Sequence, residues 1–263
     1  MRVQVVTVNH GTTEYADLFL RSLLAHHPDR SELAVLVLDN ESGDVHRLDW
    51  ARALGVRIRA SGWSLDASVN THGEVLRAAV LAEPDCDAYL FADSDVCFVT
   101  DDTVGAMARE LAANPGAFAV EAVWANEDGT VFHHRAGPPM GRSRIRESVR
   151  FAGGDWGEPY EFDVDYGDRV HPFCVLVRND APFRTTVELL GLSPAMTQCV
   201  RGGMFWDTFG LLTQVMRTHG RVWVTSTQQV VHFAGASWQP EWAADKAARR
   251  DALMGRYPLD RLR

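Results

Sequence analysis

The chain has 263 residues, 46% of them hydrophobic and 23% charged, so it can bury a substantial core and global disorder is excluded. Its formal net charge of −9 argues against a nucleic-acid-binding protein, which needs a basic surface. Anionic small ligands are not excluded, because a bound metal ion can supply positive charge locally.

The chemistry of the cysteines and of the N-terminus predicts a cytoplasmic protein. The four cysteines form no C-x-x-C pair and are expected to be reduced thiols: Cys86, Cys97, Cys174 and Cys199. The opening "MRVQVVTVNHG" is typical of a first strand and not of a signal peptide. No stretch approaches the roughly 18 apolar residues of a membrane span, so we expect no integral membrane segment.

The first hundred residues alternate between short apolar strands and helices. Strands are expected at 3–8, 33–39, 56–60 and 88–93, with helices beginning at Thr12 or Thr13 and spanning 72–83. This alternation is typical of a mostly parallel sheet covered by helices on both faces. Ligands bind such sheets beyond the carboxyl ends of the strands. The polar residues at those ends are therefore the candidate site: Asn9, Asp39, Asn40, Asp93 and Asp95.

The second half is less regular. Strands are expected at 117–123 and 172–178, a helix over 204–220 with Gly220 as its C-cap, extended segments at 221–226 and 228–235, and a last helix over 241–254. Residues 137–168 are rich in glycine, proline and charge, with aromatic residues interspersed. A connection of that length without a regular pattern predicts a mobile flap over the site.

The stretch "LFADSDVCFV" (90–99) interrupts an apolar run with Asp93 and Asp95. Side chains two apart in an extended segment point the same way, so both carboxylates face one side of the sheet mouth. Oxygen ligands suit Mg²⁺ or Mn²⁺, especially where phosphate oxygens complete the shell. The alternative is that both acids cap the next helix or lie in a solvated turn.

The sequence lacks two common nucleotide-binding motifs and fits a third ligand-binding pattern only in part. The turn after the first strand is "NHGTTE", which is not the G-x-G-x-x-G of a dinucleotide site, and no P-loop is present. A phosphohydrolase of haloacid-dehalogenase type, with Asp93 as nucleophile, remains an alternative. In that class the acids normally follow the first strand and act with a later basic residue, whereas here they lie mid-chain and the only lysine is Lys246.

Three segments together resemble glycosyltransferases of family 2 type, which have the GT-A fold. They are 5–44, ending in "LDNESGD"; 86–98, "CDAYLFADSDVCF"; and 220–237, "GRVWVTSTQQVVHFAGAS". The resemblance implies a single GT-A domain over 1–263. It further implies metal-dependent transfer of a sugar from a nucleotide-diphosphate sugar, with a UDP-sugar favoured, to an unidentified acceptor. Residues 1–100 would form the nucleotide-sugar-binding half and 101–263 the acceptor-binding half.

The resemblance also implies roles for individual residues. Asp93, Asp95 and His232 would hold Mn²⁺ or Mg²⁺, since a neutral imidazole is a sound ligand for such metals. The nucleotide sugar would be lined by Thr7, Val8, Asn9, Asp39, His72, Gly73, Asp93 and Ser94, with Asp39 at the base. For His232 the alternative is a half-buried strand histidine with a backbone partner.

The catalytic base is where the sequence departs from the family. An inverting transferase needs a carboxylate to take the acceptor proton, and "GGMFWDTFG" offers a single acid, Asp207, which is equally well explained as a helix cap. Phe205 and Trp206 form either a sugar platform or core, and His171 either lines the acceptor site or is structural. The absence of Q-x-x-R-W indicates non-processive transfer. A domain that binds nucleotide sugars without turnover is the non-enzymatic alternative.

Overall fold

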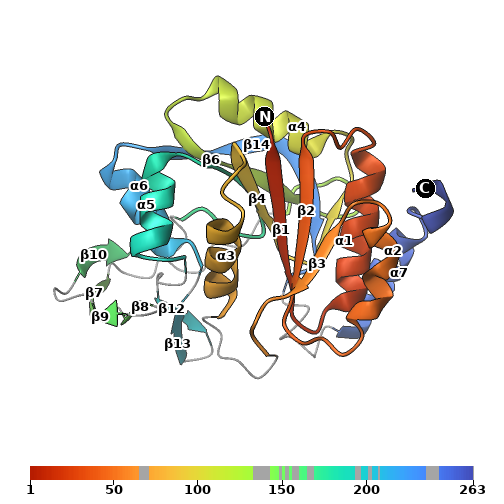
Figure 1. The fold of residues 1–263 in the computed structure, drawn as a ribbon, viewed down its shortest axis with the longest axis horizontal. Coiled ribbons are helices and arrows are strands. Elements are labelled where there is room, and N and C mark those ends of the chain that lie inside the picture. Colours follow the sequence, from red (N-terminus) through yellow and green to blue (C-terminus); the bar gives the residue numbers. More distant parts are fainter. Residues whose placement is uncertain are drawn as a thin grey trace.

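The computed structural model describes residues 1–64, 71–132, 143–147, 150–151, 154–155, 160–164, 169–192, 197–200, 203–206, 208–234 and 243–262. Its centre is an eight-stranded sheet of order β3-β2-β1-β4-β11-β6-β14-β5 (Figure 1). The strands are β1 (Val3–Asn9), β2 (Leu33–Asp39), β3 (Arg57–Ala60), β4 (Ala88–Ala92), β5 (Val96–Phe98), β6 (Ala117–Ala125), β11 (Cys174–Arg178) and β14 (Val222–His232).

The sheet combines a parallel part with a mixed part. The pairs β3/β2, β2/β1, β1/β4 and β6/β14 are parallel, whereas β4/β11, β11/β6 and β14/β5 are antiparallel. Four of the seven neighbouring pairs are thus parallel, which confirms the mostly parallel sheet. The central strands are buried on both faces, as their continuous apolar sequences predict; all seven residues of β1 are buried.

Helices cover both faces of the sheet (Figure 1). One face packs against α1 (Thr13–His26) and α4 (Thr103–Ala113), with α2 (Asp49–Arg52) beside them. The other packs against α3 (Thr71–Ala82), α5 (Ala181–Leu189) and α6 (Gly210–Thr218). The last helix, α7 (Ala243–Met254), contacts α1 through a smaller apolar cluster that includes Tyr15 and Leu253.

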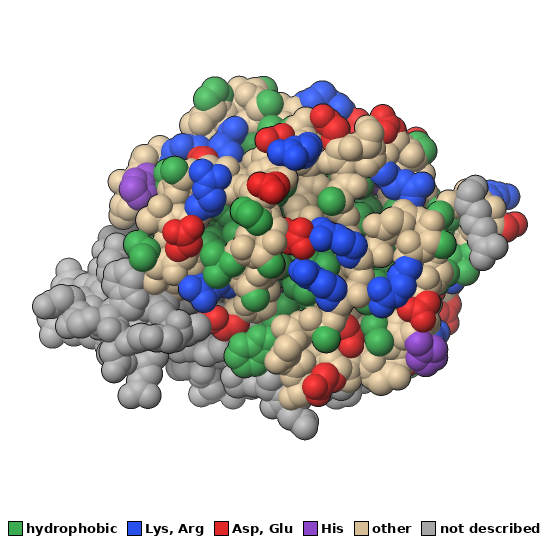
Figure 2. Space-filling view, in the orientation of Figure 1, with side chains coloured by type: hydrophobic (Ala, Val, Ile, Leu, Met, Phe, Trp, Pro, Cys, Tyr) green, Lys and Arg blue, Asp and Glu red, His purple; other side chains and the backbone are tan. Residues whose placement is uncertain are grey.

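The helices bind the sheet through fully buried apolar side chains. In α1, Phe19, Leu20 and Leu23 are all 0% exposed and join one cluster with residues of β1 and β2. Burial of each such side chain stabilises the fold by about 1.5–3 kcal/mol before ordering costs. On the face seen in Figure 2, the described hydrophobic side chains form scattered patches between acidic and basic ones, as expected for a folded surface.

The helix expected over 204–220 is shorter than predicted. Residues Gly203–Trp206 form β13, which pairs antiparallel with β12 (Thr197–Val200), and α6 begins only at Gly210. The physical reason is the backbone of Phe209, which takes a left-handed conformation (φ 70) at the N-cap and cannot continue a helix. The C-cap of α6 is His219, one residue before the predicted Gly220, and Gly220 follows it with φ 67, the left-handed conformation common just beyond a helix end.

Two helices of the second half were not predicted, α4 and α5. The start of α5 carries recognisable signals, because Asp180 accepts a hydrogen bond from the Phe183 backbone N–H and Pro182 lies in the first turn. The start of α4 does not. Its N-cap, Asp102, has a left-handed backbone and makes no side-chain cap bond.

The predicted flap, 137–168, lies largely outside the described residues. Within it, β7 (Ser143–Glu147) pairs with β10 (Tyr160–Val164), and β8 (Arg150–Phe151) with β9 (Gly154–Asp155). The expectation of a segment without regular structure is corrected to that extent. Among the described residues, no helix has the length and apolar character needed to cross a membrane.

Candidate metal and nucleotide site

The site lies where the strand order reverses. From β1 the chain continues to β2 and β3 on one side, and then returns to place β4 on the other side of β1. The pairing of β1 with β4 ends at Val6↔Phe91, although β1 runs on to Asn9. The two strands thus separate at their carboxyl ends. In open α/β sheets, such a switch point is the usual place for a ligand.

A tight turn after β4 presents Asp93 and Asp95. The Asp93 backbone N–H donates to the Phe173 carbonyl (2.9 Å), and the Val96 N–H donates to the Asp93 carbonyl (3.2 Å). Between the two acids, the Ser94 hydroxyl lies 2.8 Å from the Thr12 hydroxyl. These bonds fix the backbone of the turn, so both carboxylates are held at the edge of the sheet.

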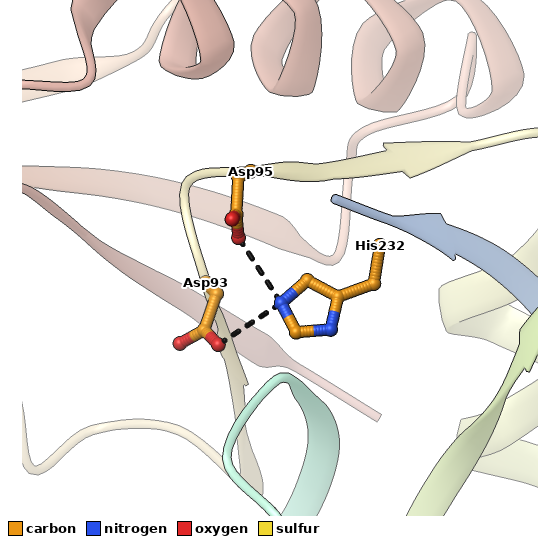
Figure 3. Close-up of side chains that lie close together, drawn as sticks. All are labelled: Asp93, Asp95 and His232. Carbon is orange, nitrogen blue, oxygen red and sulfur yellow. Dashed lines mark ion pairs between the residues drawn. The ribbon is translucent and has the colours of Figure 1, made fainter. Parts of the chain in front are cut away.

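His232 reaches the same turn from the far end of the sequence. It is the last residue of β14 and pairs with Val96 of β5, while the next N–H, that of Phe233, donates to the Asp95 carbonyl (3.0 Å). Its Nε2 lies 3.1 Å from Asp95 Oδ1 and 3.4 Å from Asp93 Oδ2, so the imidazole edge faces both carboxylates (Figure 3). The predicted trio is thus brought together.

The three side chains perturb one another's protonation. Burial lowers the pKa of His232, but the Asp95 charge and the hydrogen bonds to Asp93 and Asp95 outweigh it and raise that pKa to about 9. Burial raises the pKa of Asp93, but the hydrogen bond from His232 and the charge of that imidazole outweigh burial and hold the pKa well below its usual range. Without metal, the site is therefore an ion pair around a protonated imidazole.

The same trio suits a divalent cation. One ligand atom from each of Asp93, Asp95 and His232 lies within 4.8 Å of the others, as required for a shared ion. Two carboxylates and one imidazole match the preferences of Mn²⁺ and also accept Mg²⁺. The Asp93 side chain is 27% exposed, against 9% for Asp95, so a ligand can approach from the Asp93 side. The donor set thus fits the predicted cofactor.

Aromatic rings surround His232 on the inner side of the site. The Phe173 ring stacks on the imidazole with 5.2 Å between centroids and a 16° interplanar angle. Trp124 of β6 lies 4.6 Å from the imidazole at 55°. These contacts were not foreseen, because Phe173 and Trp124 lie inside apolar segments whose sequence does not distinguish a site neighbour from ordinary core.

The residues predicted for the nucleotide side have different surroundings. Thr7 and Val8 are buried within β1, and Asn9 lies at its end. Asp39 has both oxygens engaged: Oδ1 accepts from Asn9 Nδ2 (2.8 Å) and Oδ2 from the Ser42 N–H (3.0 Å). Asp39 therefore shapes the loop after β2, and the whole residue is only 6% exposed.

The first turn of α3 brings two more predicted residues close to the site. Gly73 is buried, and a protonated His72 would lower the pKa of Asp93. His72 Nδ1 also lies 3.2 Å from the Thr208 hydroxyl, which precedes α6. The contact between His72 and Thr208 thus joins the start of α3 to the residue that follows Asp207. Asp207 itself lies outside the described residues.

The acceptor-side predictions are only partly described. Phe205 and Trp206 belong to β13, whose backbone alone is described. For His171 the structure shows two contacts: its backbone N–H donates to Glu121 Oε2 (2.9 Å), and its Nδ1 accepts from the Phe173 N–H (3.2 Å).

Solved structures of similar architecture share this sheet. A mannosyltransferase from Pyrobaculum calidifontis, PcManGT, solved with GDP-Man and Mn²⁺, matches with a TM-score of 0.58 and 14% identity over 97% of this chain and 64% of its own. Residues 1–349 of S. aureus TarS match with a TM-score of 0.56 and 14% identity over 99% of this chain and 71% of that one. The chain has a GT-A glycosyltransferase fold.

The comparisons establish the fold at low identity. This chain spans less than two thirds of the mannosyltransferase's length. No protein-family model and no curated protein matches its sequence. The GT-A fold predicted from the resemblance is confirmed, and the phosphohydrolase alternative is not favoured.

Proposed function

We propose that this protein is a metal-dependent glycosyltransferase that moves a sugar from a nucleotide-diphosphate sugar to an acceptor. The observation that carries the proposal is the position of Asp93, Asp95 and His232. They meet at the switch point of a GT-A sheet, with their ligand atoms within 4.8 Å of one another. The GDP-Man and Mn²⁺ bound by PcManGT support the same class of donor and cofactor for this chain.

The chain's residues would divide the work as follows. Asp93, Asp95 and His232 hold the cation and, through it, the diphosphate. A bound Mn²⁺ or Mg²⁺ neutralises the charge that develops on the departing nucleoside diphosphate. The nucleotide sugar would be lined by Thr7, Val8, Asn9, Asp39, His72, Gly73 and Ser94. A UDP-sugar is our first choice of donor, and GDP-sugars are the alternative that the titration below separates.

Asp207 is our candidate for the general base of an inverting, non-processive transfer. Its carboxylate would take the acceptor hydroxyl's proton as that oxygen attacks the anomeric carbon, while the bond to the diphosphate oxygen breaks. Support comes from the sequence around Asp207 and from the next residue, Thr208. The Thr208 hydroxyl lies 3.2 Å from His72 Nδ1, and its carbonyl accepts a hydrogen bond from Arg169 (3.0 Å). The chain next to Asp207 is therefore fixed close to the residues around Asp93.

Calorimetric titration with UDP, GDP and dTDP, each with Mn²⁺ and with EDTA, tests the proposal. We expect metal-dependent binding of one of the three. Asp95→Ala and His232→Ala should each weaken it about 10-fold or more, because each removes a metal ligand. The matched control is Asp49→Ala, which removes an exposed acid paired with Arg52 on α2 and should leave binding unchanged.

Two outcomes would contradict the proposal. The first is the absence of binding to any of the three nucleotides in the presence of Mn²⁺. The second is a His232→Ala protein that binds the metal–nucleotide complex as tightly as the wild type. Slow, metal-dependent hydrolysis of a donor sugar would separate an enzyme from a domain that only binds nucleotide sugars.

A further inference from the structure

Glu121 is an acid inside an apolar strand, in the sequence "AFAVEAV" of β6. It pairs with Val175 of β11 on one side and Thr225 of β14 on the other. Burial raises the pKa of Glu121 to about 7, only partly offset by a hydrogen bond from the His171 N–H and by the charge of Arg169. A carboxyl group costs free energy to remove from water, so the presence of Glu121 inside this strand calls for a structural or functional reason.

A continuous path of hydrogen bonds runs from Glu121 to the metal-binding turn. Glu121 Oε2 accepts from the His171 N–H at 2.9 Å. His171 Nδ1 accepts from the Phe173 N–H at 3.2 Å, which requires that this nitrogen carry no proton. The Phe173 carbonyl accepts from the Asp93 N–H at 2.9 Å. The residues 169–173, here called the support segment, thus lie between Glu121 and Asp93.

The support segment also contacts the other side of the metal site. The Phe173 ring stacks on His232, while its carbonyl holds Asp93. The segment is fixed at its start as well, since the Val170 N–H donates to the Thr213 hydroxyl (3.1 Å) and Arg169 donates to the Thr208 carbonyl (3.0 Å). Phe173 therefore contacts both Asp93 and His232, and its own N–H is held by His171, whose backbone N–H is bonded to Glu121.

We propose that Glu121 is a positioning residue for the metal site, acting through the support segment to hold Asp93 and His232 at the spacing that a divalent cation requires. Groups that orient metal ligands from outside the shell commonly contribute 10- to 100-fold to metal affinity. The inference rests on the proposed function only for the biological role of the metal, and Glu121 is not among the site residues predicted from the sequence.

Mn²⁺ binding by the nucleotide-free protein tests this. Glu121→Ala removes the hydrogen-bond acceptor and should lower the affinity for Mn²⁺ about 10-fold. Glu121→Gln keeps an oxygen acceptor, so its Mn²⁺ affinity should stay within about 2-fold of wild type. Hydrogen exchange by mass spectrometry should speed up in Glu121→Ala, both in the support segment and in the turn at 93–95. Glu121→Met, which fills the space with a weak acceptor, replaces the alanine variant if that one does not fold.

Glu110 supplies a matched control. It too is a half-buried glutamate that accepts a backbone bond, from the Thr227 N–H (3.0 Å), but within the described residues its hydrogen bonds tie α4 to β14 through Thr227 and reach none of the metal ligands. Glu110→Ala should lower the melting temperature and leave Mn²⁺ affinity unchanged.

The inference is overturned if Glu121→Ala or Glu121→Met binds Mn²⁺ as the wild type does, if Glu110→Ala loses as much affinity, or if the wild type binds no Mn²⁺. A wild-type protein that binds Mn²⁺ but no nucleoside diphosphate refutes the proposed function and leaves the role of Glu121 intact.

Discussion

The two halves of the sheet build their parts of the site in different ways. On the β3-β2-β1-β4 side, strand follows strand in parallel, and the polar residues come directly after strand ends, as Asn9, Asp39 and Asp93 do. On the β11-β6-β14-β5 side, the spatial order does not follow the sequence, and the contributing residues lie within strands or the support segment. The first half is specified by local sequence and the second by long-range contacts.

The metal site depends on both halves at once. Asp93 and Asp95 come from the regular half, and His232 from the irregular one, held by β5 and by the Phe173 ring. A change in either half should therefore be felt at the same cation. Four kinds of substitution test this difference between the two halves of the sheet. They change the proposed proton acceptor, the protonation of His232, the shape of the loop after β2, and one contact between two hydroxyl groups.

The largest effect is expected from Asp207→Asn, in the irregular half. If Asp207 is the general base, the substitution keeps its shape and removes the proton acceptor. Transfer to the acceptor should then fall by a factor on the order of 10² to 10⁴ while donor binding stays nearly unchanged. The measurement is kcat with the acceptor identified by a mass-spectrometric product screen. The N-cap of α6 is Phe209, so an unchanged kcat would not make Asp207 a cap but would leave the general base unassigned.

The contrast between the halves also explains what the sequence could predict. The alternation of apolar strands and helices predicts the strands of the first hundred residues. The polar residues at the strand ends predict the site, because each of them interrupts an apolar run. The strand at 203–206 could not be foreseen, because it depends on pairing with 197–200 and on the left-handed Phe209.

The neighbours of the metal site divide in the same way. Trp124 and Phe173 carried no sequence signal, since an aromatic residue in an apolar run has many possible partners. Glu121 carried one, an acid within an apolar strand, which is the same signal that identified Asp93. What could not be read from the sequence was its partner, because His171 lies 50 residues away along the chain.

The second largest effect concerns pH and His232. Its raised pKa of about 9 means that the fold stabilises the protonated imidazole. That stabilisation is fully present below the unfolded pKa near 6.5 and is lost as pH rises through about 9. The metal-free protein should therefore lose roughly 3 kcal/mol of unfolding free energy across this window. Urea unfolding in EDTA measures it.

Metal affinity should move in the opposite direction. A cation has to displace the proton on His232, so Mn²⁺ affinity should rise about 10-fold per pH unit between pH 6.5 and 8.5. The control is His232→Gln, which has no titrating ring and should flatten both profiles. A wild-type Mn²⁺ affinity that does not change with pH would show that His232 does not bind the ion.

A smaller effect is expected at Asp39, in the regular half. Both of its oxygens accept buried hydrogen bonds, so Asp39→Ala should lower the unfolding free energy by about 1–3 kcal/mol through the unpaired Asn9 and Ser42 donors. If the main role of Asp39 is to shape the loop, Asp39→Ala should weaken the binding of UDP and of GDP by the same factor. A selective loss of one nucleotide would instead establish the direct contact with the base that the family resemblance implies.

The smallest effect concerns a hydroxyl pair between Thr12, the N-cap of α1, and the metal-binding turn. The Thr12 and Ser94 hydroxyls are 2.8 Å apart, and both residues are 7% exposed. Thr12→Val and Ser94→Ala should each cost about 1 kcal/mol of unfolding free energy, because the first leaves the buried Ser94 hydroxyl without this partner and the second leaves the Thr12 hydroxyl only its bond to Asn9 Oδ1 (3.3 Å). The double variant should cost less than the two together, by about 0.5–1.5 kcal/mol, since the second change no longer strands a hydroxyl. Chemical unfolding of the four proteins completes the cycle. Strict additivity would mean that the turn is held by its backbone bonds alone, and that the regular half needs no side-chain contact to place Asp93 and Asp95.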